Sequence, residues 1–376
     1  MSLDILKRTA LILLILVLGV IVLHFGKSLL VPLVFGALLS TLLYPFVRWL
    51  MRKGINKAIA ILFSLLLLLS FFAGLFLLLG WQISDLSEDT SQIEQQLTER
   101  YQQARDYVAQ TFGISKEKQD EMLKEQQSSS SGKVGGFVTG FLSGVGGFIT
   151  DAILTLVYIF LFLYLKEHIK RFFIRIAPQG EKDTAEEIVQ RCGRVTQKYL
   201  TGLAIMIVML WVMYGIGFSI AGVKNPIFFA ILCGLLEIIP FIGNITGTTV
   251  TVLVSIMQGG GANVVIGILI TYGLIQFIQT YIIEPLVVGS EVNINPLFTI
   301  ISLVAGEFIW GISGMILAIP IMGVVKIVCD HVPGLKPIGT LVGETGPGKE
   351  SSFKRKMARV TDKIGSWFGG KHRGDS

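Results

Sequence analysis

The longest stretches without a charged residue constrain the fold of this chain more than any other feature. Residues 58–84, 200–223 and 238–283 contain no Asp, Glu, Lys or Arg. A transmembrane helix needs about 20 consecutive apolar residues. The whole chain follows the same pattern: 52% of its residues are hydrophobic and 15% are charged, against about one-quarter charged in a soluble domain. We therefore predict an all-α polytopic membrane protein.

Basic residues beside the apolar runs predict the orientation of the first three spans, near 10–26, 28–47 and 58–82. The loop before the third span carries four basic residues and no acid: Arg48, Arg52, Lys53 and Lys57. Cytoplasmic loops have such an excess of Lys and Arg, so we place this loop and the N-terminus in the cytoplasm. No small-residue cleavage site follows the first run, so we read it as a retained span and not as a signal peptide. Residues 1–82 thus form a unit of three spans.

A polar segment with an acidic excess follows at 83–135. Its apolar residues recur at steps of three and four, which is typical of one face of an amphipathic helix: Ile93, Leu97, Tyr101 and Ala104. Three spans that start in the cytoplasm place this segment outside. We predict a small helical extracytoplasmic segment.

The fourth span is expected within 136–165, followed by a cytoplasmic amphipathic loop that ends at 198. Its first part is rich in glycine, and small residues let helices approach closely in lipid. Asp151 interrupts this span, either as a functional charge or as a residue near the outer interface. A fifth span is predicted at 200–223. The basic tail, 331–376, is expected to be cytoplasmic and disordered or weakly helical.

An internal repeat marks the predicted transport core, 199–330, with copies at 225–257 and 295–325. The segment NPIFFAILCGLLEIIP, which begins at Asn225, aligns with NPLFTIISLVAGEFIW, which begins at Asn295, at an offset of 70 (295 − 225). Polar residues are rare here, so the matched Asn-Pro pairs and the matched glutamates carry most of the weight.

The repeat places each of its glutamates at a defined depth. Glu237 and Glu307 each lie 11 residues after the proline of their copy (237 − 226 and 307 − 296). That distance is about 16 Å of helix, and the hydrocarbon core is about 30 Å thick. Because an Asn cap followed by proline starts a helix well, both carboxyl groups are predicted near the bilayer midplane.

Helix-breaking residues follow each glutamate: Pro240, Gly243 and Gly247 in the first copy, Gly311 and Gly314 in the second. Backbone breaks at such depth only where it is buried in protein or faces water. We therefore predict a re-entrant hairpin for each copy. The fold is then six spans plus two inverted re-entrant hairpins, and the alternative is eight straight spans. Either arrangement leaves the C-terminus in the cytoplasm. Broken helices in inverted repeats point to a transporter site.

The predicted span at 262–285 carries polar side chains at four-residue steps: Tyr272, Gln276, Thr280 and Glu284. Pro285 follows directly as a further helix break. A single Thr in a span usually bonds its own backbone, but a row that includes an amide and a carboxylate favours the lining of a cavity. Contact between helices is the alternative.

The sequence resembles the autoinducer-2 exporter family of bacterial inner-membrane proteins, also described as a permease family. The resemblance rests on IPFIG at 239–243, on EPLVVGSEVNINPL at 284–297 and on the glycine-rich stretch from 306 that ends in AIP. It covers about residues 5 to 330. It implies a location in the bacterial inner membrane and transport of a small molecule or an ion. Asn244 departs from the family, in which proline is common at this place, and the cargo stays open.

The residues favour a secondary transporter over other classes of protein. There is no P-loop motif for ATP, no catalytic motif and no metal or cofactor motif, and the three cysteines form no framework. Basic residues at span borders disfavour nucleic acid as the partner that the net charge of +6 could suggest. For the cargo, the family resemblance implies export of a small molecule such as autoinducer-2, and we predict that an ion or proton gradient drives it. A Na⁺(Li⁺)/H⁺ antiporter is the alternative, and a non-transporting scaffold is a third. A homo-oligomer is possible.

The candidate site residues fall into two groups. The residues expected to bind substrate or ion are Glu237, Glu284, Glu307, Asn225, Asn295, Gln276 and Thr280. The residues expected to break helices or to gate are Pro240, Gly243, Gly247, Pro285, Gly311 and Gly314.

Overall fold

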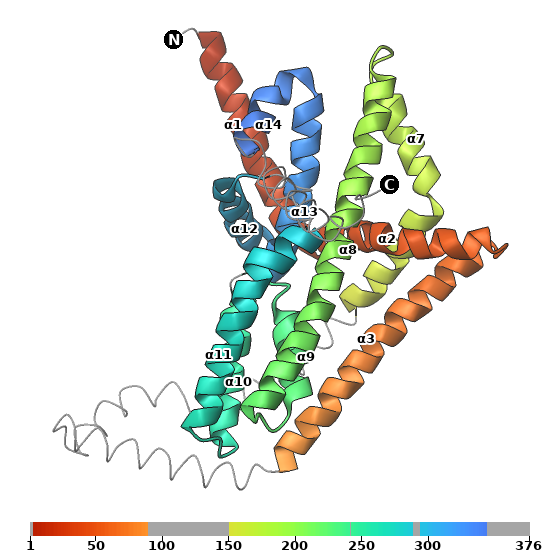
Figure 1. Ribbon diagram of the computed structural model, residues 1–376. Coiled ribbons are helices and arrows are strands. Elements are labelled where there is room, and N and C mark those ends of the chain that lie inside the picture. The colour runs from red at the N-terminus through yellow and green to blue at the C-terminus, as the bar shows by residue number, and fades with distance from the viewer. Residues whose placement is uncertain (1–2, 89–149, 241, 289–293, 344–376) are drawn as a thin grey trace, which may run out of the picture. The chain divides into compact units, whose positions relative to one another are not determined.

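The computed structural model describes residues 3–88, 150–240, 242–288 and 294–343 (Figure 1). Most of the predicted extracytoplasmic segment, the glycine-rich start of the fourth span and most of the C-terminal tail lie outside these residues. The described chain is helical and contains no strand, only an isolated bridge between Ile294 and Gly343. The prediction of an all-α protein is therefore confirmed.

The helices before the repeat are long and apolar, apart from a short amphipathic one. They are α1 (Leu3–Phe25), α2 (Lys27–Arg52), α3 (Lys57–Glu88), a helix at Thr150–Tyr164, α7 (Lys166–Ile176) and α8 (Lys182–Ala221).

The helices of the repeat and of the chain after it are mostly shorter. They are α9 (Pro226–Leu236), α10 (Ile242–Met257), α11 (Ala262–Ile278), the π-helix η1 (Gln279–Val288), α12 (Pro296–Trp310), α13 (Ile312–His331), the 3₁₀ turn η2 (Pro333–Leu335) and α14 (Lys336–Val342).

Five helical segments are long and apolar enough to cross a membrane, namely Lys27–Arg52, Lys57–Gly80, Lys182–Ala221, Ala262–Val287 and Ile312–His331. The bent pair Thr150–Tyr164 and Lys166–Ile176 makes a sixth if it counts as one span. Large apolar side chains cover the outside of these helices, as lipid-facing surfaces require. The chain is thus a polytopic membrane protein.

The described residues form two compact units. The first comprises residues of Met1–Lys27, Leu165–Val208 and the chain from Gln276 onward, and the second comprises residues of Ser28–Tyr164 and Met209–Ile275. The boundaries fall at the start of α2, just before α7, within α8 and near the end of α11. The first repeat copy therefore belongs to the second unit, and the second copy belongs to the first unit.

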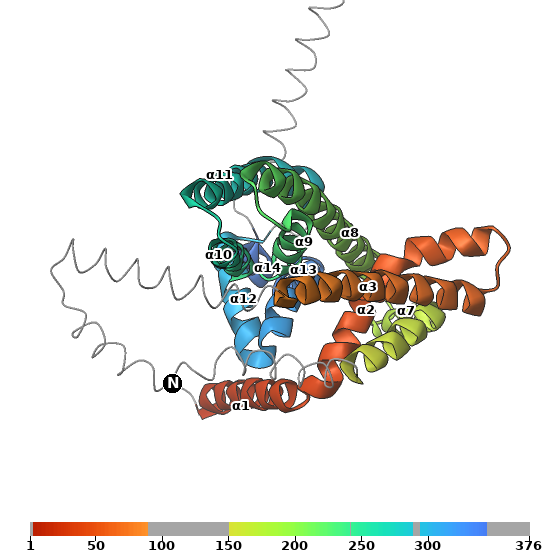
Figure 2. The same ribbon diagram turned by 90° about the horizontal axis from the view of Figure 1, so that it is seen from below.

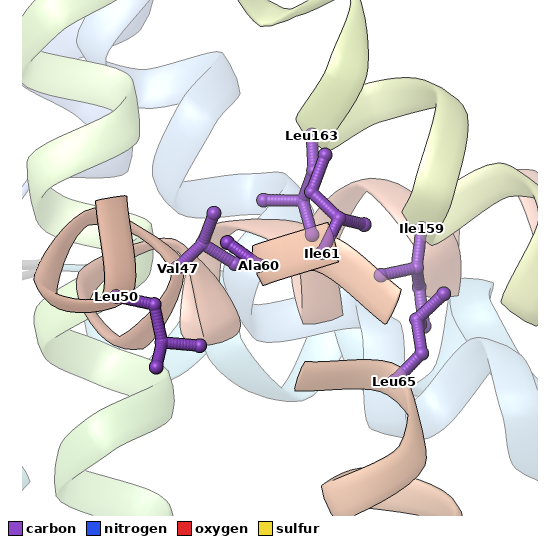
Figure 3. Packing of buried hydrophobic residues seen from close by; sticks show 7 residues of the cluster. All are labelled: Val47, Leu50, Ala60, Ile61, Leu65, Ile159 and Leu163. Carbon is purple, nitrogen blue, oxygen red and sulfur yellow. The ribbon is translucent and has the colours of Figure 1, made fainter. Parts of the chain in front are cut away.

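In the second unit, an apolar core joins α2, α3 and the helix at Thr150–Tyr164 (Figure 3). It consists of Val47, Leu50, Ala60, Ile61, Leu65, Ile159 and Leu163. The helices approach closely because Gly36 has no side chain: a Cβ there would lie 2.6 Å from the Cβ of Tyr158. Lys57 Nζ donates a hydrogen bond of 2.8 Å to the carbonyl of Tyr164 and so joins the ends of two helices.

Candidate transport site

The first repeat copy forms a tight helical hairpin of α9 and α10, which lie side by side (Figures 1 and 2). Proline at 240 explains where α9 ends, because its ring clashes with the carbonyl four residues earlier, that of Leu236. Two glycines of α10 then meet α9 backbone to backbone. A side chain on Gly243 would collide with the Leu236 carbonyl, and a Cβ on Gly247 would lie 3.1 Å from Cys233 Sγ.

Glu237 lies at the turn of this hairpin, directly after the last residue of α9, and is half-buried. Three other groups of the second unit are close enough to interact with its charge: Tyr214 on α8, Cys233 on α9 and Tyr272 on α11. Of these, Tyr214 is 1% exposed and faces the interior fully. The carboxyl group thus lies near two tyrosines and a cysteine, from three different helices.

Trp211, one helical turn before Tyr214 on α8, packs against the same part of α9. Its ring stacks on Phe71 with centroids 6.4 Å apart, and it occupies the space that a Cβ on Gly234 would need. Its buried Nε1 has no hydrogen-bond partner among the residues that the structure describes. Neither Trp211 nor Tyr214 belongs to a sequence motif, so only the fold brings them to Glu237.

The second copy forms a hairpin of α12 and α13, with a sharper turn (Figure 1). Gly311 alone connects the two helices, with a φ of 64° that favours glycine. Gly306 and Gly314 face each other so closely that a side chain on either would collide with the other's carbonyl. Glu307 lies inside α12, one turn before Gly311, and its side chain is exposed.

The two asparagines that start the hairpins also differ. The Asn295 side chain accepts a hydrogen bond of 3.0 Å from the backbone N–H of Leu297, as an N-cap does. The Asn225 side chain makes no capping bond, and its backbone has a φ of −121°. The backbone N–H of Asn295 also donates a 2.8 Å bond to the carbonyl of Val342 in α14.

The tip of the second hairpin contacts the end of α1 within the first unit. Trp310 Nε1 donates a hydrogen bond of 2.8 Å to the Leu23 carbonyl, and His24 Nδ1 lies 3.2 Å from the Ile309 carbonyl. No sequence pattern indicated this contact, because the segments are almost three hundred residues apart.

The polar row predicted on 262–285 lies on α11 and η1. The buried amide on this stretch is Gln279, which is 6% exposed. Gln279 is not a member of the predicted row, because the row was read at four-residue steps. Gln276 is half-buried, whereas Thr280 and Glu284 are exposed. The row continues into η1, whose π-helical winding contains Pro285; such winding is frequent at functional sites. Glu284 interacts electrostatically with Tyr199, which is buried on α8.

The predicted site residues are thus divided between the two units. Asn225, Glu237, Pro240, Gly243 and Gly247 lie together on the first hairpin. The others lie in the first unit, at the end of α11, on η1 or on the second hairpin: Gln276, Thr280, Glu284, Pro285, Asn295, Glu307, Gly311 and Gly314. Among the residues that the structure describes, no three His, Cys, Asp or Glu side chains gather as a metal site.

An ion pair outside the spans fixes the amphipathic helix α7 to the start of α8. Lys170 Nζ donates a hydrogen bond of 2.7 Å to Glu186 Oε1, and Gln190 donates a second one to the same oxygen. The hydrogen bond and charge of Lys170 lower the pKa of Glu186, and the hydrogen bond with Glu186 raises the pKa of Lys170.

Comparison with known proteins identifies the family. The family described as "AI-2E family transporter" matches residues 13–334. The Bacillus subtilis "Putative transport protein YrrI" is 24% identical over 319 residues, which cover 81% of this chain and 87% of YrrI. The Escherichia coli "Putative transport protein YhhT" is 22% identical over 329 residues, which cover 88% of this chain and 91% of YhhT.

These matches agree with the resemblance found in the sequence and extend over both hairpins and most helices. Relatives of two different organisms that are described as transport proteins align with almost their full length. The chain therefore belongs to the AI-2E transporter family.

Proposed function

We propose that this protein is a secondary transporter that exports a small molecule such as autoinducer-2, driven by a proton or ion gradient. The observation that carries the proposal is Glu237, an ionisable group at the turn of a broken helix, surrounded by Tyr214, Tyr272 and Cys233. An ionisable residue inside a membrane protein is costly and marks an ion or substrate pathway. Membership of a transporter family supports the same function.

We propose that both hairpins are re-entrant and inverted, in a bacterial inner membrane with both termini in the cytoplasm. Helix lengths support this arrangement over eight straight spans for three of the four hairpin arms, whereas the fourth, α13, has 20 residues and is long enough to span. The helices α9, α10 and α12 have 11, 16 and 15 residues, fewer than the about 20 that a span needs. The helix is interrupted at both turns. At membrane depth, backbone that is not helical must be buried in protein or face water.

In this proposal the carboxyl groups of Glu237, Glu284 and Glu307 bind the coupling ion or proton. Gln276 and Thr280 belong to the same path along α11 and η1. The N-termini of α9 and α12, at Asn225 and Asn295, carry the partial positive charge of a helix start. The prolines and glycines listed above provide the breaks at which the hairpins or the repeat units move for alternating access.

A Na⁺(Li⁺)/H⁺ antiporter is the second candidate. The oxygen-bearing side chains that follow one another on α11 and η1 favour it, because hydroxyl, amide and carboxylate oxygens suit a hard cation. The two functions share the carboxylates and differ in the cargo. A pH-gradient signal in vesicles that depends on Na⁺ would favour the antiporter.

The test of the transport function uses purified protein in liposomes with an imposed pH gradient and labelled autoinducer-2. Wild type should move the label, and Glu237→Gln combined with Glu307→Gln should abolish coupled movement. Because Gln retains the size and polarity of Glu, a folded double variant with full coupled activity would refute the assignment of these carboxylates.

The test of the topology uses single cysteines at glycines whose substitution meets no neighbouring atom, Gly261 after the first hairpin and Gly334 after the second. In sealed vesicles of known orientation, an impermeant thiol reagent should reach Gly261→Cys from outside and Gly334→Cys from the cytoplasm. Reaction of both positions from the same side would exclude inverted hairpins.

A further inference from the structure

The buried face of α10 contains no large apolar side chain. Its buried residues are Gly243, Gly247, Thr248, Thr251 and Ser255. Its exposed face is apolar, as at Ile245 and Leu253, which are 65% and 53% exposed. A helix of a soluble protein shows the reverse distribution. The interior of the second unit is therefore more polar along α10 than the surface that faces lipid.

The polar residues on this side form a line that we call the α10 polar line: Asn244, Thr248, Thr251, Ser255 and Gln258. Steps of four and three keep them on one face, and 14 residues (258 − 244) correspond to about 21 Å of helix. One end begins beside Gly243, which packs on the peptide between Leu236 and Glu237. The other end lies at the open base of the hairpin.

Close packing explains the part of the line near the turn. Gly247 lies against Cys233, and Thr251 Oγ1 donates a hydrogen bond of 2.7 Å to the Gly247 carbonyl and lies 3.5 Å from Cys233 Sγ. These hydroxyl and glycine positions allow α9 and α10 to touch, as small residues do between membrane helices. Nothing in this half requires a ligand.

The half near the base is different, because its polar atoms are buried without partners. Ser255 and Gln258 are 3% and 9% exposed, and Ser255 Oγ and Gln258 Oε1 make no hydrogen bond with the described protein. Buried polar atoms of this kind are unfavourable unless a bound molecule satisfies them. Ordered water commonly does so where several such groups lie together.

The register of the hairpin brings a third polar residue to the same level. Gly247 of α10 lies opposite Cys233 of α9. The two helices are antiparallel, so Ser255, eight residues after Gly247, lies level with Asn225, eight residues before Cys233. The Asn225 side chain makes no capping bond to α9. Asn225, Ser255 and Gln258 therefore lie at about the same level at the base of the hairpin.

We propose that the α10 polar line is a proton path: water enters at Ser255 and Gln258, and the hydroxyl groups of the closely packed half carry the proton on toward Glu237. At each water or hydroxyl group of the path one O–H bond forms and another breaks, a carboxylate oxygen of Glu237 accepts the last proton, and no bond between heavier atoms changes. The other titratable groups near that carboxylate are Tyr214, Tyr272 and Cys233, from α8, α11 and α9. The proposal rests on the proposed coupling role of Glu237 and adds the route by which Glu237 is protonated.

Thiol labelling tests the path without relying on transport. Single cysteines are placed at Thr248 and Ser255 in full-length protein whose three native cysteines are replaced by alanine. Matched controls on the exposed face of the same helix are Ile245→Cys and Leu253→Cys. A charged methanethiosulfonate reacts with the thiolate, which forms in water, so the polar-line cysteines should react about tenfold faster than their controls. Equal or slower reaction at both polar-line positions would mean dry packing and would overturn the proposal.

A transport measurement provides the second readout. Ser255→Ala combined with Gln258→Leu should lower the proton-coupled rate about tenfold, a typical effect of impaired proton transfer, whereas Thr249→Val on the exposed face should not. An unchanged rate in the double variant would overturn the path as a proton route. Fast labelling of the polar line together with full coupling in Glu237→Gln would support a water-filled path and contradict only the proposed coupling role of Glu237.

Discussion

The two hairpins derive from one repeated sequence, but they place their glutamates differently. Glu237 lies at the turn of the first hairpin, near tyrosines of two other helices, whereas Glu307 lies within α12 and is exposed. The residue that explains the difference is Pro240, which corresponds to Trp310 at the offset of 70 (310 − 240). Proline ends α9 just before Glu237, and tryptophan lets α12 continue beyond Glu307. Equal spacing in sequence therefore does not give equal surroundings.

The largest effect that would sharpen this comparison is on coupled transport. Glu237→Gln alone should reduce it by about 10²-fold, as expected when a proton-transferring side chain is lost, and Glu307→Gln alone should reduce it less, because that carboxyl group is exposed. The measurement is proton-coupled uptake in liposomes at equal protein density. Equal losses in the two single variants would show that the hairpins are functionally equivalent despite their different turns.

The second prediction concerns the glycine contacts, in which the hairpins agree. Gly243→Ala and Gly314→Ala should each destabilise the protein by about 1–3 kcal/mol, because the added methyl group meets a backbone carbonyl that cannot move without opening the hairpin. Thermal unfolding in detergent measures the change. Gly273→Ala is the control, since nothing lies within 4 Å of that position. Wild-type stability in Gly314→Ala would argue against the close approach of α12 and α13.

A smaller effect separates the two asparagines. Asn295→Ala removes an N-cap hydrogen bond and should cost about 1 kcal/mol. Asn225→Ala removes no capping bond and should change the unfolding temperature less. If Asn225→Ala lowers the unfolding temperature more than Asn295→Ala does, Asn225 caps α9 in the membrane, and this difference between the hairpins is contradicted.

The smallest effect lies outside both hairpins and serves as a reference for pH experiments. The lowered pKa of Glu186 stabilises the contact of α7 with α8 above the ordinary pKa of a glutamate, and this contribution is lost as the pH falls through the lowered value. The raised pKa of Lys170 contributes below the ordinary lysine value and is lost as the pH rises through the raised one. Both side chains are partly exposed, so solvent weakens the pair.

Hydrogen exchange in α7 measures this reference. The protection of the α7 amides, which is the exchange rate corrected for its intrinsic pH dependence, should be greatest between the two pKa values and should fall below about pH 4. Lys170→Met should remove this dependence on acid pH. If the transport rate falls over the same acid pH range, and no longer does so in Lys170→Met, the pH response of transport would be assigned to α7 and not to Glu237.

Much of the fold follows from local sequence. Charge-free runs predict α2, α3, α8 and α11 because lipid requires long apolar helices, and Asn-Pro pairs predict the starts of α9 and α12 because proline fits a first turn. The surroundings of the site do not follow. Tyr214 and Gln279 look like ordinary residues of apolar helices, and only packing in three dimensions brings them inside. Gln279 shares its face with the buried Ile275 and Ile283, four residues away on either side, so the row predicted from Tyr272 identified Thr280 and passed over Gln279.

The contacts between the paired glycines have a mechanical consequence. Where two backbones are in direct contact there is no space between them, so the two helices of each hairpin cannot slide past each other or separate by small steps. We expect each hairpin to move as a rigid body. Any change of backbone conformation is then confined to the segments that join the hairpin to the long helices. The distance between spin labels on α12 and α13 should then stay the same throughout the transport cycle. A second distance would show that the hairpin itself opens.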